Sequence, residues 1–432
     1  MSSALATRIS QEHASAASAL PASVISLERR RNALQALETQ GLPSSRDENW
    51  KYANLRPLEK VRFAPAAHAV PAEAARSMAL PPPIAGYSRY TFVDGVFAPE
   101  LSASADRPGI AVRSLRQSAV SAAPPSAPDA RFALLNEAFA TDGASVQVSA
   151  GADRESCLEI IFVASDDAQA GASYPRVELQ VADGARFGLI ERHLSAAGSA
   201  SFVNGVVDIS VGRGASVRHY RVQQLGSRAL WFDTLSATLA RDAKYRLYMI
   251  SLGALSARST VNIQLAGERA DVGCYAASVA DMHQSHDHFV LVDHLVPRAV
   301  TEQTFRGIAA GRARVGFNGK IVVRKDAHGT DSRQSLKGLL AGPEAEIDVR
   351  PQLEIYTDDV KCSHGATAGK LDDNMLFYLL SRGLDRDTAQ RLLKWAFLED
   401  VVSRIEIPVL RRHIETSLAG QLKDTAGLTE LI

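Results

Sequence analysis

The chain has 432 residues, 46% of them hydrophobic, and its 48 Lys and Arg residues balance 48 Asp and Glu residues. Zero net charge argues against a nucleic-acid-binding protein, whose surface is usually basic, and no run of about 18 apolar residues predicts a membrane span. The three cysteines (Cys157, Cys274 and Cys362) are few and odd in number, and the N-terminal segment has no apolar signal-peptide core. We therefore expect a cytoplasmic protein without disulfides.

Residues 1–140 are predicted to form an N-terminal region of helical and mixed structure. Helix-forming residues fill Ser26–Leu37, and Gly41 and Pro43 follow them as stop signals. Residues 64–83 and 118–128 are rich in Ala and Pro, which predicts linkers. Between the linkers, Tyr87–Val96 alternates and carries Asp94-Gly95, which predicts a short hairpin.

From about residue 145 the apolar period becomes two, and a repeat begins. The units Val177–Ala185, Val207–Ala215, Leu235–Ala243 and Val261–Ala270 start 30, 28 and 26 residues apart. Each unit has apolar residues at i, i+2 and i+4, then a corner that ends on Ala, and a second strand follows. A period of 20–50 residues is typical of a solenoid, whose coils bury their inward faces by stacking.

The repeat predicts a mainly β fold with a right-handed parallel β-helix over residues 141–370. A β-sandwich of irregular hairpins is the alternative. It is less favoured, because hairpin turns such as Asn-Gly are mostly missing between the strands.

Residues 371–432 return to helical spacing and are predicted to form a C-terminal helical domain. After the capping candidates Asp385 and Asp387, one helix face carries apolar residues, and Pro408 precedes a last helix near 410–422. A solenoid needs covered ends, and a helical tail is also a natural docking surface. The apolar face comprises Ala389, Leu392, Leu393, Ala396, Phe397 and Val401.

The run Asp358–Gly369 places Cys362 and His364 two positions apart among small residues. Residues i and i+2 of an extended segment point to the same side, and thiolate and imidazole bind borderline-soft metals and iron–sulfur units well. The pair is either half of a metal site that awaits a partner or two unrelated surface side chains.

A second group of polar residues lies between residues 281 and 294. One interpretation is a mononuclear metal site. The favoured alternative is a polar solenoid face whose histidines bond Asp or backbone groups, because no His-Glu-x-x-His spacing is present. The group comprises Asp281, His283, His286, Asp287, His288, Asp293 and His294.

Nucleotide and hydrolase motifs are absent from the sequence. Residues 365–371 resemble a phosphate-binding loop only superficially, because the glycine spacing is one residue short and Leu371 replaces the magnesium-binding Ser or Thr. No Gly-x-Ser-x-Gly is present. Any ATP hydrolysis tied to this protein is expected from another chain.

Residues 46–52, 317–321, 351–367 and 372–384 together resemble the SufD family of the SUF iron–sulfur cluster assembly system. The long C-terminal motif with Lys-Cys-Ser-His-Gly-Ala-Thr is highly specific. The related SufB family is the alternative; three cysteines and no Cys-x-x-Cys favour SufD.

The resemblance implies a non-catalytic scaffold with a β-helix flanked by helical regions. It implies a heterodimer with SufB and docking of the ATPase SufC on about residues 384–425, including Leu392, Leu393, Ala396 and Phe397. Cys362 and His364 match the family's Cys-x-His at the SufB interface, where they would hold iron or a nascent iron–sulfur cluster. SufB would supply a Cys and a carboxylate.

Three further possibilities stay open at this point. A flavin is linked to the assembled complex, but the sequence has no flavin motif. The isolated chain has an expected free solenoid edge, so it can form a homodimer. The rivals from other classes are a β-helix enzyme acting on polysaccharide, which needs a groove lined by carboxylates and arginines, and a self-sufficient metal-binding protein that uses the 281–294 histidines.

Overall fold

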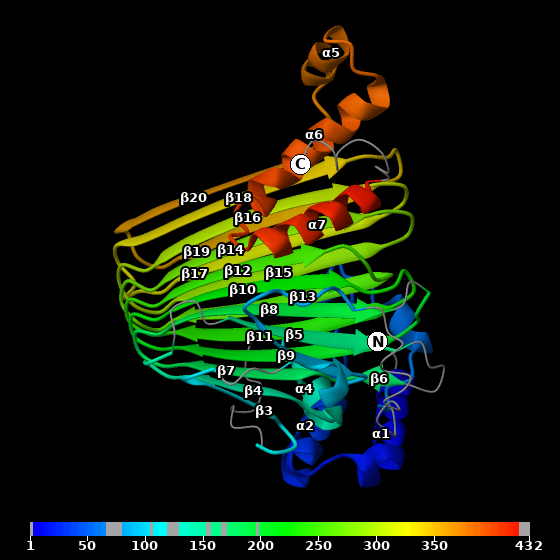
Figure 1. The fold of residues 1–432 in the computed structure, drawn as a ribbon, viewed down its shortest axis with the longest axis vertical. Helices are drawn as coiled ribbons and strands as arrows, with labels where there is room; N and C mark the ends of the chain where they lie inside the picture. Colours follow the sequence, from blue (N-terminus) through cyan, green and yellow to red (C-terminus); the bar gives the residue numbers. More distant parts are fainter. Residues whose placement is uncertain are drawn as a thin grey trace.

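The computed structural model describes residues 3–65, 80–103, 107–118, 129–152, 157–165, 171–195 and 198–422. Its centre is a parallel β-helix made of two facing sheets (Figure 1). The β20 sheet contains β2 (Val96–Phe97), β1 (Ser88–Val93), β5 (Cys157–Ala164), β8 (Arg186–Ser195), β10 (Ser216–Gln224), β12 (Lys244–Ser251), β14 (Asp271–Ala280), β16 (Val300–Ala309), β18 (Thr330–Leu340) and β20 (Val360–Gly369), in this order. The β19 sheet contains β19 (Glu346–Ile355), β17 (Arg314–Val323), β15 (Ser285–His294), β13 (Ser256–Leu265), β11 (Leu230–Leu239), β9 (Phe202–Val211), β7 (Arg176–Val181), β4 (Gly143–Val148) and β3 (Ile110–Ser114), and β6 (Ala172–Ser173) pairs with β9.

From β7 onward the chain alternates between the two sheets, so each of these coils contributes one strand to each sheet. Only β1–β2 and β3–β4 pair in the antiparallel sense among the described strands. The predicted parallel β-helix is therefore confirmed. Its repeat places one apolar side chain above another: Val177, Val207, Leu235, Val261 and Val290 are consecutive register partners, all buried. Full burial of each such side chain contributes about 1.5–3 kcal/mol.

The corners of the repeat also form as the sequence indicates. Gly184, Gly214 and Asp242 take φ values of 73°, 63° and 58° at equivalent places in three successive coils. This left-handed conformation favours Gly and tolerates Asp. The alanine after each of them is buried, since the corner folds its small side chain against the core. A larger residue there would push the corner away from the coil.

The local predictions for the N-terminal region hold in the part that the structure describes. Helix α2 (Leu27–Gln40) starts at Ser26, whose hydroxyl accepts from the Arg29 amide, and ends at Gly41 with φ 67°. The β1–β2 hairpin turns at Asp94 and Gly95. Most of the two predicted linkers, residues 66–79 and 119–128, lies outside the described residues.

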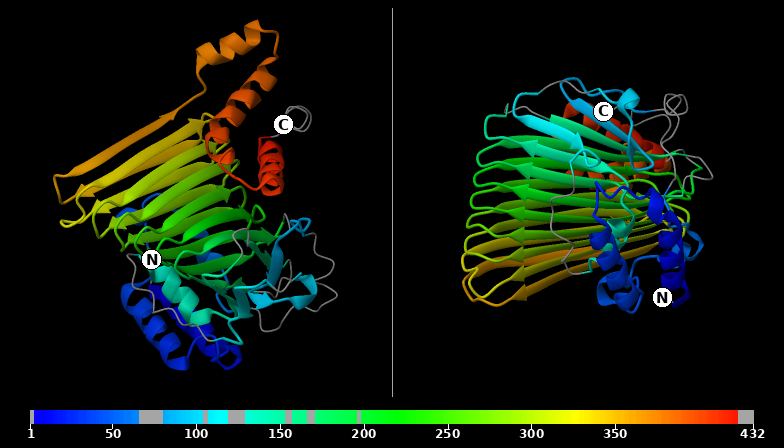
Figure 2. Two further views of the ribbon diagram at one scale, coloured as in Figure 1. Left: turned by 60° about the vertical axis from the view of Figure 1, so that its left-hand side comes forward. Right: turned by 90° about the horizontal axis from the view of Figure 1, so that it is seen from below.

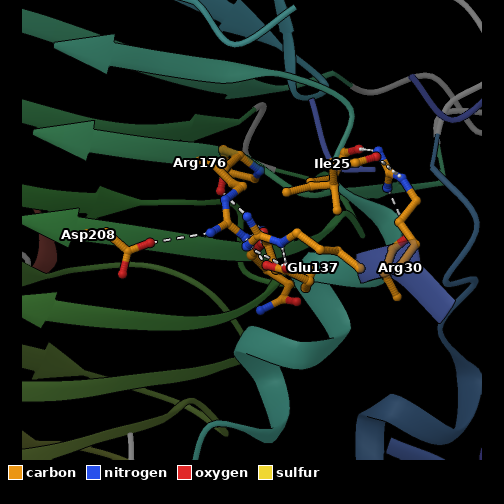
Figure 3. Close-up of polar contacts among 11 residues, drawn as sticks. Ile25, Arg30, Glu137, Arg176 and Asp208 are labelled. Atoms are coloured by element: carbon orange, nitrogen blue, oxygen red, sulfur yellow. Dashed lines mark hydrogen bonds and ion pairs between the residues drawn. The ribbon is translucent and has the colours of Figure 1, made fainter. Parts of the chain in front are cut away.

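The N-terminal helices α1 (Ser3–Ala16), α2 and α4 (Arg131–Phe139) lie at the early-coil end of the solenoid (Figures 1 and 2), where α4 packs on β9 and β11. One buried arginine, Arg30, links α2 to α4, and another, Arg176, links α4 to the sheet (Figure 3). Arg30 donates to the carbonyls of Ile25 and Ala138, at 3.1 and 2.9 Å. Arg176 of β7 contacts Glu137 at 3.1 Å and Asp208 at 3.3 Å. These bonds fix α4 against the solenoid.

The C-terminal helices are α5 (Asp373–Ser381), α6 (Arg386–Val402) and α7 (Pro408–Gln421). As predicted, Asp385 caps α6 by accepting from the Thr388 amide. The buried second half of α6 and α7 cover the outer face of the β20 sheet. A column of outward tyrosines lies beneath them: Tyr220 and Tyr248 stack with centroids 4.8 Å apart, and Tyr248 and Tyr275 with centroids 5.2 Å apart. The N-terminal end of α6, together with α5, projects beyond the last coil (Figure 2).

Candidate functional site

Cys362 and His364 lie on β20, the last strand of its sheet, and their side chains belong to the inward-facing series of the solenoid. In register, Cys362 stands beside Ser332 and His364 beside Gln334, and both of these neighbours are buried. No further strand follows β20 in its sheet among the described residues. Consequently Cys362 is half-buried against the core and His364 is exposed.

The residues beneath this pair form a fixed polar floor. The Ser332 hydroxyl donates to Cys362 Sγ at 3.0 Å. The Gln334 amide donates to Gln303 Oε1 and to the Gly319 carbonyl, both at 2.9 Å. A Cβ at Gly319 would lie 2.5 Å from Gln303 Oε1, so only glycine leaves room for the two amides. The sequence reasoning missed this floor, although the i, i+2 pattern extended to β16–β20 would have located it.

Two ligands alone do not complete a metal site. A sulfur and an imidazole suit iron or an iron–sulfur unit, which usually take four protein ligands. Among the described residues, no three His, Cys, Asp or Glu side chains are grouped to hold a metal ion. Within the described chain, this end of the solenoid therefore offers two potential ligands, Cys362 and His364, and no complete metal site.

The 281–294 group is divided by the pleat of β15. His286, His288 and His294 point into the solenoid and are fully or almost fully buried. The acidic residues face outward: Asp287 pairs with Arg258, and Asp293 with Arg324 at 2.8 Å. The polar face that these three histidines share is therefore the inner face of the solenoid. His286 bonds the Ser278 hydroxyl at 2.9 Å and also interacts with the backbone of Gly253 and Ala254, while His294 bonds the Thr301 hydroxyl at 2.8 Å. Backbone is thus among the partners, as the favoured interpretation expected, and hydroxyls take the place of the expected Asp side chains.

Burial keeps the three inward histidines neutral. It lowers the pKa of His288 to about 3, with added repulsion from His286 and Arg258, and the pKa values of His286 and His294 to about 4. An unfolded chain has histidines near pKa 6.5 and so binds more protons below that pH. The stability that these neutral histidines preserve is therefore complete above pH 6.5 and is lost as the pH falls toward 4.

We expect the free energy of unfolding to drop between pH 7.5 and 5.0 by about 2 kcal/mol for each inward histidine. In His288→Leu the drop in the free energy of unfolding should be smaller by about 2 kcal/mol, the contribution of one histidine. At pH 7.5 the substitution should change the free energy of unfolding little, because neither nitrogen of His288 has a hydrogen-bond partner among the described residues. Urea denaturation at both pH values measures the effect. His328→Leu, at an exposed histidine, is the control, and an unchanged pH dependence in His288→Leu would contradict the assignment.

The apolar face predicted in the tail divides along α6. Ala389 and Val401 are buried, whereas Leu392, Leu393 and Phe397 are half-buried and Ala396 is exposed. Phe397 packs against the cluster of α6, α7 and the tyrosine column. Nearby, α5 exposes Met375 by 60%, Phe377 by 72% and Tyr378 by 56%. The structure thus leaves apolar surface on both helices beyond the last coil.

No helix in the described part of the chain is both long and apolar enough to cross a membrane.

Comparisons with known proteins identify the family. Residues 162–397 match the family description "SUF system FeS cluster assembly, SufBD core domain", and residues 10–160 match "SufBD protein N-terminal region". The iron-sulfur cluster assembly protein SufD of Escherichia coli is 29% identical over 394 residues, covering 90% of this chain and 91% of that protein. An iron-sulfur cluster assembly SufBD family protein of Synechocystis is 28% identical over 407 residues, covering 90% of each. The chain therefore belongs to the SufBD family of the SUF iron–sulfur cluster assembly system.

Proposed function

We propose that the chain is a non-catalytic scaffold subunit for iron–sulfur cluster assembly. It contributes Cys362 and His364 to a site that a SufB-type partner completes. The observation that carries the proposal is the placement of this pair on the inward side of β20, which no further described strand covers. A nascent cluster held this way is accessible to the chains that build and receive it.

The open end of the solenoid suits a partner of the same architecture. The free edge of β20 offers backbone donors and acceptors for strand pairing. The β19 side chains are mostly half-buried; its last residue, Ile355, is 39% exposed, and Tyr356 directly after it is 59% exposed. A second parallel β-helix continues both sheets and buries this surface. The same edge allows a homodimer when the SufB-type chain is absent.

An enzyme acting on polysaccharide is less well supported. A hollow of about 1080 Å³ lies along the outer face of the β19 sheet, where Gln147, Gln180, Ser210 and Thr238 line it together with Arg213. No Asp or Glu of the described residues lines this hollow. Glycoside hydrolysis requires a pair of carboxyl groups across the scissile bond. The hollow provides donors but no such pair.

The ATPase SufC is proposed to dock on the C-terminal helices. α6 connects the buried tyrosine column to the projecting α5. Movement of an ATPase bound to these helices would act directly on the last coil, because residues 370–372 connect β20 to α5. An ATPase docked on these helices would lie close to the proposed ligand pair without contributing ligands.

Co-purification of the tagged chain from its native cell tests the proposal. We expect a SufB-type chain and an ATPase to accompany it. Ile355→Glu/Tyr356→Glu should lose the SufB-type chain, because the pairing end gains two charges, while the ATPase stays bound through α6. Met282→Glu, at an exposed corner residue in an earlier coil, is the control. A chain that is recovered alone, or a SufB-type chain that survives the double substitution, contradicts the proposed pairing.

A further inference from the structure

A hollow of about 920 Å³ lies where the 3-10 helix η3 (Arg56–Lys60) passes over the corners that precede β9 and β11. Its lining contains four cationic side chains: Arg56, Lys60, Arg62 and Arg228. Glu59 is the one carboxylate among the described lining residues. The whole chain has no net charge, so this accumulation is a local property of the surface. A concave surface of one charge raises the local concentration of ligands of the opposite charge.

Three of the four cations of this basic hollow form no ion pair with a carboxylate of the described chain. Within the described residues, no carboxylate oxygen lies within 4.0 Å of Arg56, Lys60 or Arg62, which makes these side chains unlike the paired arginines of the corners. Arg228 is held in place, because its Nε donates to the Gly198 carbonyl at 2.8 Å. Guanidinium groups bind phosphate through paired N–H donors, and a lysine adds a point charge.

The floor of the basic hollow adds a polar and an apolar element. The hydroxyl oxygen of Ser201 is buried and has no hydrogen-bond partner among the described residues. Phe202 and Leu230, only 2% and 4% exposed, belong to the packed apolar core beneath the hollow and make its base rigid. The combination fits a ligand whose phosphate groups meet the cations at the mouth of the hollow.

We propose that this basic hollow binds a phosphorylated small molecule of nucleotide size, with its phosphates among Arg56, Lys60, Arg62 and Arg228. The volume lies within the range of about 300–1,000 Å³ that is usual for ligand pockets. The residues lie at the corners of early coils and under η3, whereas Cys362 lies on the last strand. The proposed site is therefore separate from the proposed cluster site, and each can fail without the other.

Isothermal titration calorimetry of the purified full chain with ADP tests the proposal. We expect saturable binding that weakens when NaCl is raised from about 50 to 200 mM, because salt screens exposed charges. Pyrophosphate should compete with ADP, and adenosine should not. Arg62→Gln/Arg228→Gln should weaken ADP binding by at least about tenfold, since each charge-assisted hydrogen bond contributes more than one power of ten.

The matched control is Arg213→Gln/Arg298→Gln, which removes two exposed corner arginines from another face and should change the affinity for ADP by less than about twofold. Thermal unfolding of both double variants verifies that they fold. Absence of ADP binding by the wild-type chain overturns the proposal. Equal binding by wild type and Arg62→Gln/Arg228→Gln, or equal competition by adenosine and pyrophosphate, also overturns it.

Discussion

His364→Ala is expected to reduce cluster assembly at least about tenfold without unfolding the chain. The imidazole is exposed on the last strand, and no described residue depends on it for a hydrogen bond. If His364 is a ligand of the proposed site, its loss removes a metal–protein bond that the remaining ligands do not replace, and loss of a second-shell partner alone already costs about 10- to 100-fold in metal affinity. Because the side chain is outside the core, the free energy of unfolding should change by less than about 0.5 kcal/mol.

The measurement is the yield of iron and sulfide bound to the co-purified complex, together with growth under iron limitation. His328→Ala, another exposed histidine near the same end of the solenoid, serves as the control. Cys362→Ala should be compared separately, because it also removes the sulfur that accepts from Ser332 and a contact with the core. Full cluster yield and normal growth with His364→Ala would show that the imidazole is not a ligand.

The sequence predicts the β-helix because one physical cause acts on every coil. Apolar residues at i, i+2 and i+4 must face inward, and a left-handed corner must follow, as at Gly184 and Gly214. Because each coil repeats this pattern, an irregular unit does not change the prediction, which the neighbouring units still support. The tyrosine column gave a similar but overlooked signal: Tyr220, Tyr248 and Tyr275 occupy equivalent outward positions, which indicates that something covers them.

The orientation of β15 could not be read from alternation. Val290 and Val292 share the face of the histidines, while Phe289 and Leu291 are apolar on the opposite face. Both faces therefore look buried, and both are, because the N-terminal region covers the outside. Arg258 on β13 contacts Trp50 with the guanidinium carbon 4.3 Å from the ring centroid. Such long-range packing has no local signal in the sequence.

The sequence located the candidate pair Cys362 and His364, but it did not reveal the residues that lie beneath them. Cys362 and His364 are two residues apart, so the extended backbone alone places them on one face. Ser332 and Gln334 lie 30 residues earlier and reach them only through the stacking of coils. Glu191, Arg221 and Asp233 form a comparable buried network inside earlier coils, with N–O distances of 2.7 and 2.6 Å from Arg221. These charged residues occupy inward positions, where the alternation pattern predicts apolar side chains, so the pattern does not identify the network.

Leu392→Asp/Leu393→Asp is expected to abolish capture of the ATPase while the chain stays folded. These leucines are half-buried and belong to none of the apolar clusters among the described residues. Two carboxylates in an apolar contact must be desolvated on binding without a partner, which costs several kcal/mol. Removal of residues 385–432 is a poorer test, because it uncovers Tyr220, Tyr248 and Tyr275 along with the docking surface.

Pull-down of the ATPase with equal amounts of wild-type and variant chain provides the measurement. The matched control is Leu27→Asp, which places a carboxylate at an exposed leucine (54%) in the first turn of α2, where the helix dipole tolerates it. Loss of capture in Leu392→Asp/Leu393→Asp with retention of the SufB-type chain would place the docking surface on the first half of α6. Retention of the ATPase by the double variant would move the docking surface elsewhere, and the exposed Phe377 and Tyr378 of α5 are then the next residues to substitute.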